Sequence, residues 1–219
     1  MTVRINKPAL NLREELTKAQ SVVPYVQQQF WMDGLVENGT FDSDTTGWTS
    51  NNSALSNVNS ALRITQQGAG LGLAQTTIQT TVGKTYKFVW DYIAGTAPTP
   101  TVRVSTLSFS NNLADVIATD EAITFVATTT TTYINFRMAT TSDGVYSNFD
   151  NVKVFEADNN DEVVHSLPLG WKPLHVYEDG LLQREGDVHD YTVVKTGGAY
   201  VIKPAVQPTA TTETCVIAE

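Results

Sequence analysis

Few side chains capable of catalysis lie close together in this chain of 219 residues. Asp187, His189 and Asp190 form the tightest group. In a strand, residues 187 and 189 would share a face while residue 190 would point away. The group therefore indicates a turn with a solvated histidine rather than a catalytic cluster. Cys215 lies in the apolar stretch TCVIAE, which predicts a small buried hydrophobic side chain rather than a nucleophile.

The short motifs of common enzyme sites are missing from the sequence. There is no G-x-S-x-G, no H-E-x-x-H and no dinucleotide fingerprint. Residues 68–74 are rich in glycine, but no G-K-[S/T] ending follows, so we expect a loop. A glycosidase needs two carboxylates facing each other across a cleft. The acidic residues offer no recognisable context for such a pair, so a glycan-cleaving enzyme is the weakest of three functional hypotheses.

The charge balance and residue counts exclude several other classes. The chain carries 14 Lys and Arg against 23 Asp and Glu, for a formal net charge of −9. Such an acidic chain is poorly suited to binding a phosphate backbone, so no nucleic-acid partner is expected. The single cysteine excludes an intramolecular disulfide and a cysteine-cluster zinc site. No apolar run approaches the roughly 18–20 residues of a membrane span, so no membrane partner is expected.

The middle of the chain predicts an all-β fold. Short β-rich stretches recur every 10–15 residues or so between Gly, Asn, Asp and Pro, a cadence that favours a β-sandwich. Tyr86, Phe88, Trp90 and Tyr92 alternate with polar or smaller residues, which predicts one shared face. The clearest stretches are 61–65, 74–80, 85–95, 101–109, 122–128, 132–140 and 149–157.

Residues 35–157 resemble the jelly rolls of carbohydrate-binding modules. The opening stretch LVENGTFDSDTTGWT (35–49) is similar to their entry motif, and FDNVKVFE (149–156) is similar to their last strand. The resemblance implies a β-sandwich that presents aromatic side chains to sugar rings. The candidate glycan contacts are Trp90, Tyr92 and Tyr146, although the alternation around Trp90 favours core packing.

The same resemblance implies a structural calcium between the two ends of the domain. The matching acidic positions are Asp42 and Asp150. Carboxylate oxygens suit calcium, but two carboxylates supply only part of a shell of about six to eight oxygens. The alternative is that both side chains accept hydrogen bonds from turn amides. No other cofactor is expected.

Residues 1–34 predict an attachment arm with a short helix. Asn11 and Glu14 form a capping-box pattern, and a lone helix of this length is marginal in water. Burial against another chain would stabilise it, and the candidate docking residues are Leu10, Leu12, Leu16, Phe30 and Trp31. The alternative is that the aromatic residues near position 30 fold back onto the following domain.

Residues 158–219 predict a small C-terminal β domain. Asp179-Gly180 is a strong two-residue hairpin signal between apolar stretches. The segment KPLHVYEDGLLQREGDVHDYTVV (172–194) resembles small β modules of bacteriophage virion proteins. The opening TVRINKPALNLREELTKAQ (2–20) is also similar to the N-termini of structural proteins from tailed phages of aquatic bacteria.

The three segments together predict a structural protein of a tailed-phage virion. The expected role is capsid decoration (cement) or a fibre, with the arm docked on other virion proteins and the β domains displayed outward. The expected state is a homotrimer on the virion, and no enzymatic activity is expected. The alternative is a carbohydrate-binding module that recognises a host surface glycan.

Overall fold

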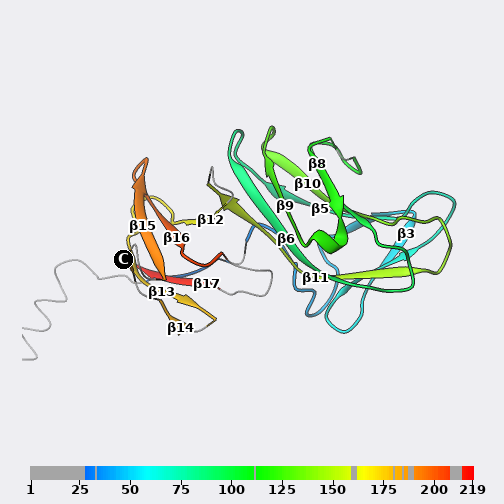
Figure 1. Cartoon of the computed structure of the whole chain (residues 1–219), viewed down its shortest axis with the longest axis horizontal. Helices are drawn as coiled ribbons and strands as arrows, with labels where there is room; N and C mark the ends of the chain where they lie inside the picture. The colour runs from blue at the N-terminus through cyan, green and yellow to red at the C-terminus, as the bar shows by residue number, and fades with distance from the viewer. Residues whose placement is uncertain are drawn as a thin grey trace, which may run out of the picture.

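The computed structural model describes residues 28–219 except 33, 111, 159–161, 180, 184, 187–189 and 208–213. Two lobes lie side by side along the long axis (Figure 1). The larger lobe contains β2 to β11, and the smaller one contains β1 and β12 to β17. Within this described part, no helix has the length and apolar character needed to cross a membrane.

One layer of the larger lobe is a five-stranded antiparallel sheet in the order β2-β5-β10-β7-β8. Its central strand β10 pairs with β5 on one side and β7 on the other. The strands are β2 (Thr49–Asn51), β5 (Leu73–Gln79), β10 (Thr131–Arg137), β7 (Thr101–Ser105) and β8 (Ala114–Ile117).

The opposite layer is built around the long strand β11, which pairs with both β4 and β6. Strand β3 extends the sheet beside β4, and β9 extends it beside β6. A β-bulge interrupts the β6–β11 register between Asp150 and Lys153. The strands are β3 (Ser53–Asn57), β4 (Leu62–Gln66), β6 (Thr85–Ile93), β9 (Ala122–Val126) and β11 (Tyr146–Ala157), and a 3-10 turn, η1 (Ala118–Asp120), precedes β9.

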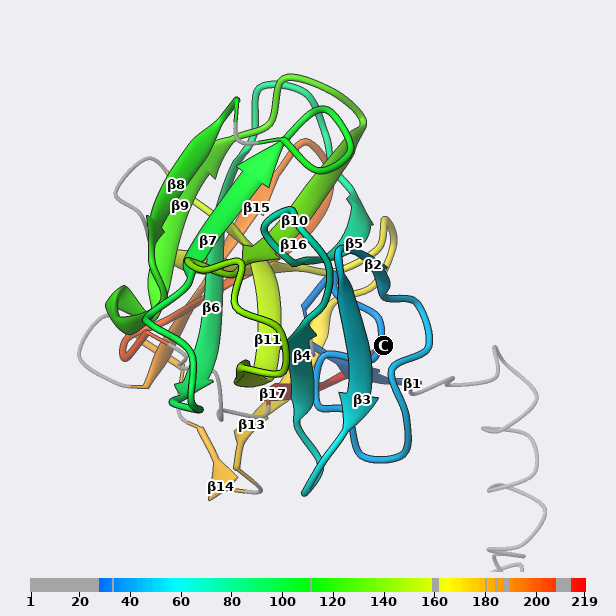
Figure 2. The ribbon, with the colours of Figure 1, turned by 90° about the vertical axis from the view of Figure 1, so that its right-hand side faces the viewer.

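The main core lies between these two layers, and Figure 2 views the molecule from the side of the larger lobe. Tyr86, Phe88 and Trp90 point inward from β6, as their alternation predicts, and Phe136 stacks on Phe149 from the opposite layer at 3.8 Å between ring centroids. Every second side chain of the strands in both sheets thus faces a shared core, which confirms the predicted all-β sandwich. The short strands β2, β3 and β8 are not among the predicted stretches.

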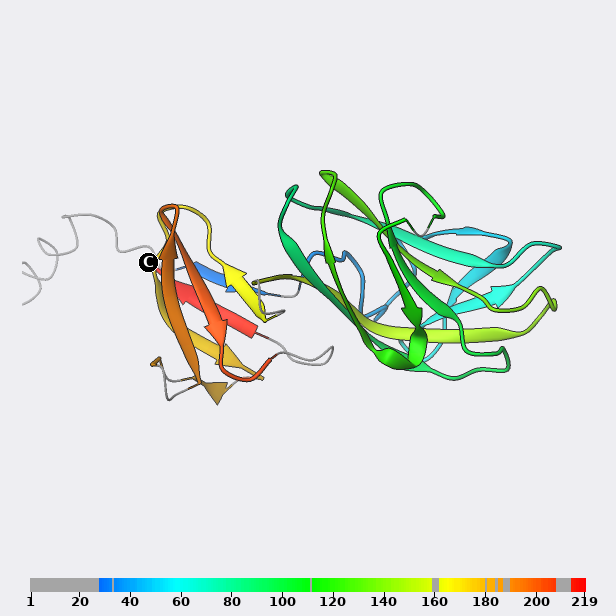
Figure 3. The ribbon, with the colours of Figure 1, turned by 45° about the horizontal axis from the view of Figure 1, so that its top comes forward.

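A continuous sheet joins the lobes, because β11 pairs with β12 and β12 pairs with β16. Figure 3 shows this passage from the sandwich into the small lobe. A second sheet of the small lobe runs β1-β17-β13-β14. The strands are β1 (Gln28–Trp31), β12 (Val163–Ser166), β13 (Pro173–Glu178), β14 (Leu181–Leu182), β15 (Tyr191–Thr196), β16 (Ala199–Pro204) and β17 (Thr214–Ala218).

The structure places residues 28–31 in the small lobe, not in a separate arm. Phe30 pairs with Val216 and Trp31 with Cys215 through the backbone of β17, so these two predicted docking residues belong to a sheet. Strand β1 pairs with the backbone N–H and C=O groups along one edge of β17, which would otherwise face water. The other docking residues, Leu10, Leu12 and Leu16, and the predicted helix lie outside the described residues.

The predicted hairpin at residue 179 is present. Strand β13 pairs antiparallel with β14, and Asp179 has a φ of 48°. Asp tolerates this left-handed conformation better than most residues, and two-residue hairpin turns require it. Cys215 is buried, as predicted.

Candidate functional site

The outer face of the five-stranded sheet carries a row of polar side chains. The registers align Thr49 with Gln75, Gln75 with Asn135, Asn135 with Arg103, and Arg103 with Asp115. Because side chains alternate along a strand, these residues lie opposite the core-facing Ile and Val positions. One hydrogen-bonding side chain from each strand therefore lies on a single line across the sheet.

Asn135 is the central residue of this row, and it is fully buried. Its Nδ2 donates to Ser105 Oγ at 3.2 Å and to the Ser110 carbonyl at 3.4 Å. Its Oδ1 has no hydrogen-bond partner among the described residues. A buried acceptor without a partner costs about 1–3 kcal/mol, which a ligand donor would recover.

The loop after β7, of which residues 106–110, 112 and 113 are described, folds back over part of this face. Gln75 Oε1 accepts hydrogen bonds from the Phe109 amide at 2.5 Å and from Ser108 Oγ at 3.2 Å. Phe109 has a φ of 53°, which turns the chain toward the sheet. Gln75 therefore fixes the β7–β8 loop above β5, and the loop carries its half-buried phenyl ring to the edge of the polar row.

Arg103 supplies a cation to the row. Its Nε is buried and has no hydrogen-bond partner in the described part of the chain. Burial lowers the pKa of its guanidinium, the charge of Arg137 lowers the pKa further, and Asp115 acts in the opposite direction. Guanidinium N–H groups can donate to hydroxyl or carboxylate oxygens of a ligand.

Tyr133 adds an aromatic surface beside these polar groups. It lies on the same outer face of β10, two residues before Asn135, and is half-buried. Its neighbours in register are Thr77 and Ser105, both small. A ring next to convergent amide and guanidinium groups is the composition of a ligand-binding surface.

The structure corrects the assignment of Trp90 as a candidate glycan contact. Trp90 is fully buried, and its indole Nε1 donates to the Ala118 carbonyl at 2.8 Å. Phe88 packs against it at 4.7 Å between ring centroids. Both the ring and its polar group are satisfied inside the core, so neither is available to a sugar.

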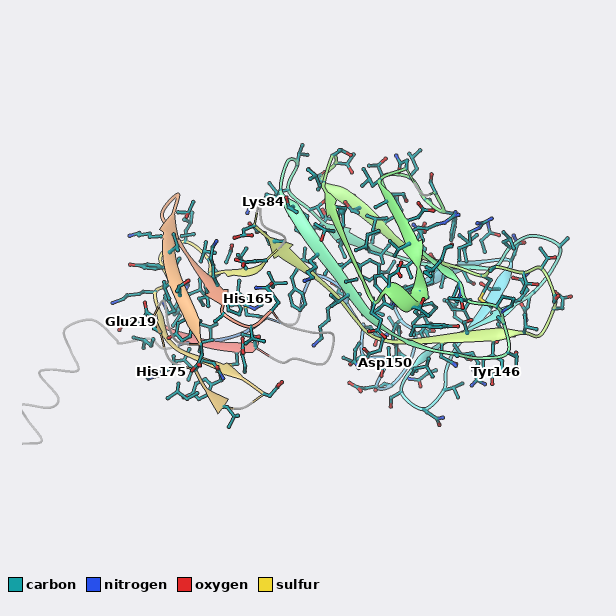
Figure 4. All side chains as sticks on the ribbon, in the orientation of Figure 1. Lys84, Tyr146, Asp150, His165, His175 and Glu219 are labelled. Carbon is teal, nitrogen blue, oxygen red and sulfur yellow. The ribbon has the colours of Figure 1, made fainter. Side chains whose placement is uncertain are left out.

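Tyr92 and Tyr146 belong to the other sheet and do not join the polar row. Tyr92 is half-buried and packs on Phe149 at 5.5 Å between ring centroids. The Arg63 guanidinium lies 3.9 Å from the centroid of the Tyr146 ring and covers one of its faces. Figure 4 shows Tyr146 near the far end of β11. The structure thus brings neither tyrosine together with Asn135 or Arg103.

Asp42 and Asp150 lie close enough to interact, next to the bulge in β11. Burial raises the pKa of Asp150, and repulsion from Asp91 and Asp42 raises it further. Asp150 Oδ1 accepts from the Asn151 amide at 2.7 Å, and Asp42 Oδ2 accepts from Thr40 Oγ1 at 2.9 Å.

The calcium between Asp42 and Asp150 stays a prediction. Across the described part of the chain, no group of three or more His, Cys, Asp or Glu side chains is placed to hold a metal ion. Calcium takes about six to eight oxygen ligands. Asp150 accepts from a backbone amide, as the alternative expects, whereas Asp42 accepts from the hydroxyl group of Thr40.

A pocket at the junction of the lobes contains a buried histidine (Figure 4). His165 lies on β12 with only 4% of its surface exposed, and its Nε2 has no partner among the described residues. Burial lowers its pKa to about 4. Phe155 packs on the imidazole edge-on at 5.8 Å between ring centroids. His165 is therefore neutral in the folded protein near pH 7.

Sequence reasoning missed every residue of the polar row, although one local signal marks its centre. Asn135 lies on the outer face of β10, between Ile134 and Phe136, which face the core. The sequence does not show that this carboxamide lies on a central strand between Gln75 and Arg103. The interstrand registers show it.

No protein-family model matches the sequence, and no curated protein matches it. Among solved structures, a family 4 carbohydrate-binding module is 19% identical with a TM-score of 0.44, covering 55% of this chain and 99% of its own. A point mutant of a family 29 carbohydrate-binding module is 14% identical with a TM-score of 0.36, covering 60% and 92%. The enzymatically active domain of tailspike protein 4 from bacteriophage CBA120 is 13% identical with a TM-score of 0.39, covering 56% and 21%.

Proposed function

We propose that this chain is a non-catalytic glycan-binding protein, and that the outer face of β2-β5-β10-β7-β8 is its binding surface. The observation that carries the proposal is the central part of the polar row, Gln75–Asn135–Arg103. Here Asn135 Oδ1 and Arg103 Nε are both buried, and neither has a hydrogen-bond partner among the described residues. Sugar hydroxyls both donate and accept hydrogen bonds, so they complement this pair of groups.

Tyr133 and the β7–β8 loop complete the proposed surface. The tyrosine ring offers an apolar face to the C–H side of a pyranose, while the row beside it contacts hydroxyl groups. The strands hold both sets of groups in a fixed register, so little conformational entropy is lost on binding. A row that crosses five strands suits an extended chain of sugars better than a single one.

The Tyr133→Ala variant tests this proposal by affinity electrophoresis and calorimetry against a panel of neutral and acidic polysaccharides. We expect the variant to bind the polysaccharide that the wild type binds with an affinity about tenfold or more lower, because loss of an aromatic anchor has an effect of this size. Thr124→Ala, a half-buried residue of β9 in the opposite sheet, is the matched control and should bind normally. An unaltered affinity in Tyr133→Ala, or no binding to any member of the panel, would reject the proposal.

A second candidate function is attachment to a phage particle, and it is supported by the small lobe. The hairpin β13–β14 belongs to the segment that resembles virion modules, and Leu181 and Leu182 on it are 71% and 55% exposed. Both side chains are therefore accessible to a neighbouring copy or to another virion protein. Such a protein would be a capsid decoration or fibre subunit, with a homotrimer as the expected state.

Light scattering at micromolar concentration tests the association. The wild-type chain should have the mass of three copies, and Leu182→Asp should shift it toward the monomer because burial of an unpaired charge is costly. Val206→Asp, at another exposed apolar position of the lobe, is the comparison. A monomeric wild type that is also missing from purified particles would reject this second function.

A further inference from the structure

The open part of the same face carries two cations and one anion. Arg103 and Arg137 lie on adjacent strands, and Asp115 is opposite Arg103 on the edge strand β8. The remaining neighbours in register, Thr101 and Leu73 beside Arg137, are uncharged. This face is thus locally positive on a chain whose formal net charge is −9.

The two guanidinium groups are close enough to repel each other. Arg137 is two positions beyond Asn135, the register partner of Arg103, so the arginines are diagonal neighbours roughly 7–8 Å apart. The charge of Arg137 lowers the pKa of Arg103, in addition to the effect of burial. Asp115 balances one of the two charges at most, and no ion pair or hydrogen bond joins the Arg137 guanidinium to another described residue.

Resting on the proposed function, we infer that the ligand is an acidic glycan, and that the carboxylate of a uronic acid unit binds between Arg103 and Arg137. The planar guanidinium fork matches the two oxygens of a carboxylate. An anion at this position relieves the repulsion between the arginines and supplies an acceptor to the buried Arg103 Nε. The half-buried ring of Tyr133, on the same face of β10, then contacts the neighbouring sugar unit.

The test compares oligouronates with their carboxyl-reduced forms, in which each carboxylate becomes a CH₂OH group and the linkages stay the same. Oligogalacturonate, oligomannuronate and oligoguluronate are titrated into the full chain by calorimetry. We expect at least one oligouronate to bind about tenfold or more tighter than its reduced form, as charge-assisted hydrogen bonds predict. Its affinity should also fall as the salt concentration rises.

Arg137→Gln should lower the affinity for that oligouronate about tenfold and change the affinity for the reduced form by less than about twofold. Lys87→Gln removes the same charge from the opposite sheet and should change neither. Equal binding of acidic and reduced forms, both abolished by Tyr133→Ala, would overturn this inference while supporting the proposed function. Absence of binding to every glycan, acidic or neutral, would overturn both.

Discussion

Asn135 and His165 each bury a polar atom that has no partner among the described residues, in very different surroundings. Asn135 lies beside the Ser105 hydroxyl and the Arg103 side chain on a sheet face. His165 lies against Phe155 at the lobe junction, where burial keeps its imidazole neutral. The amide oxygen of Asn135 belongs to the proposed binding surface, whereas the imidazole of His165 makes a packing contact that should depend on pH.

His165 should make stability depend on pH between about 6.5 and 4. Its pKa is about 4 in the folded chain, against an ordinary 6.5. Between these values the unfolded chain binds a proton that the folded chain does not, so stability falls as pH falls through this window. The loss is on the order of 3 kcal/mol at the lower end, at 1.36 kcal/mol per pKa unit.

Urea unfolding at pH 7, 5.5 and 4 measures this effect as a difference between variants. His165→Leu should lose less stability than the wild type over the window, because it cannot be protonated. His175→Gln, at an exposed histidine of the same lobe, should follow the wild type. Parallel curves for the wild type and His165→Leu would show that His165 is not responsible.

The β7–β8 loop is positioned by one side chain of a different strand. Gln75 Oε1 accepts from both Phe109 N and Ser108 Oγ, and no other described side chain bonds the amide of Phe109. The Gln75 carboxamide therefore holds the loop against the outer face of the five-stranded sheet.

Gln75→Ala should release the β7–β8 loop and lower the free energy of unfolding by about 1–3 kcal/mol, the cost of leaving a buried partner unsatisfied. Hydrogen exchange of the Phe109 amide should become faster. Gln79→Ala, an exposed residue on the same face of β5, is the control and should behave as the wild type. Unchanged protection of Phe109 in Gln75→Ala would show that other contacts hold the loop.

Strand β1 is the second element whose role can be isolated. A chain lacking residues 1–32 loses β1, whereas a chain lacking residues 1–27 keeps it. The shorter chain should show faster exchange of β17 amides, since β17 then becomes an edge strand. Equal exchange rates in the two truncated chains would mean that β1 contributes little to the sheet.

The sequence predicted those elements that are determined by residues close together in the chain. The alternation of Tyr86, Phe88 and Trp90 predicted a half-buried strand, and Asp179 predicted a turn, because each depends on neighbouring residues only. Strands β2 and β3 are rich in Ser and Asn, which are typical of loops, and they are strands because β5 and β4 pair with them. The polar row was not predictable, since Gln75, Asn135 and Arg103 become neighbours only through two interstrand registers.

At the scale of the whole molecule, the sandwich has an interior of its own. Every residue of the main core cluster lies between Phe41 and Val154, and the small lobe has a separate cluster around Val176 and Ile202. A third, small cluster contains Val89, Phe155 and Val163. The core of the sandwich thus contains no described side chain of the small lobe.

A fragment of residues 34–158 should fold alone and retain the full chain's affinity for its glycan. All residues of the polar row and the β7–β8 loop lie within it. Near-UV circular dichroism and calorimetry with the polysaccharide identified for the full chain measure both properties. A fragment that folds but no longer binds would place essential contacts in the small lobe.

The pairing of β1 with β17 has a consequence for protein synthesis. Gln28 is the register partner of Ala218, so the small lobe encloses the whole sandwich as an insertion in its sequence. On the ribosome, the sandwich can fold as soon as β11 has emerged, while β1 waits for a partner made almost the whole chain later. Premature termination after residue 158 would thus release a finished sandwich with an unpaired strand attached, and not half of each lobe.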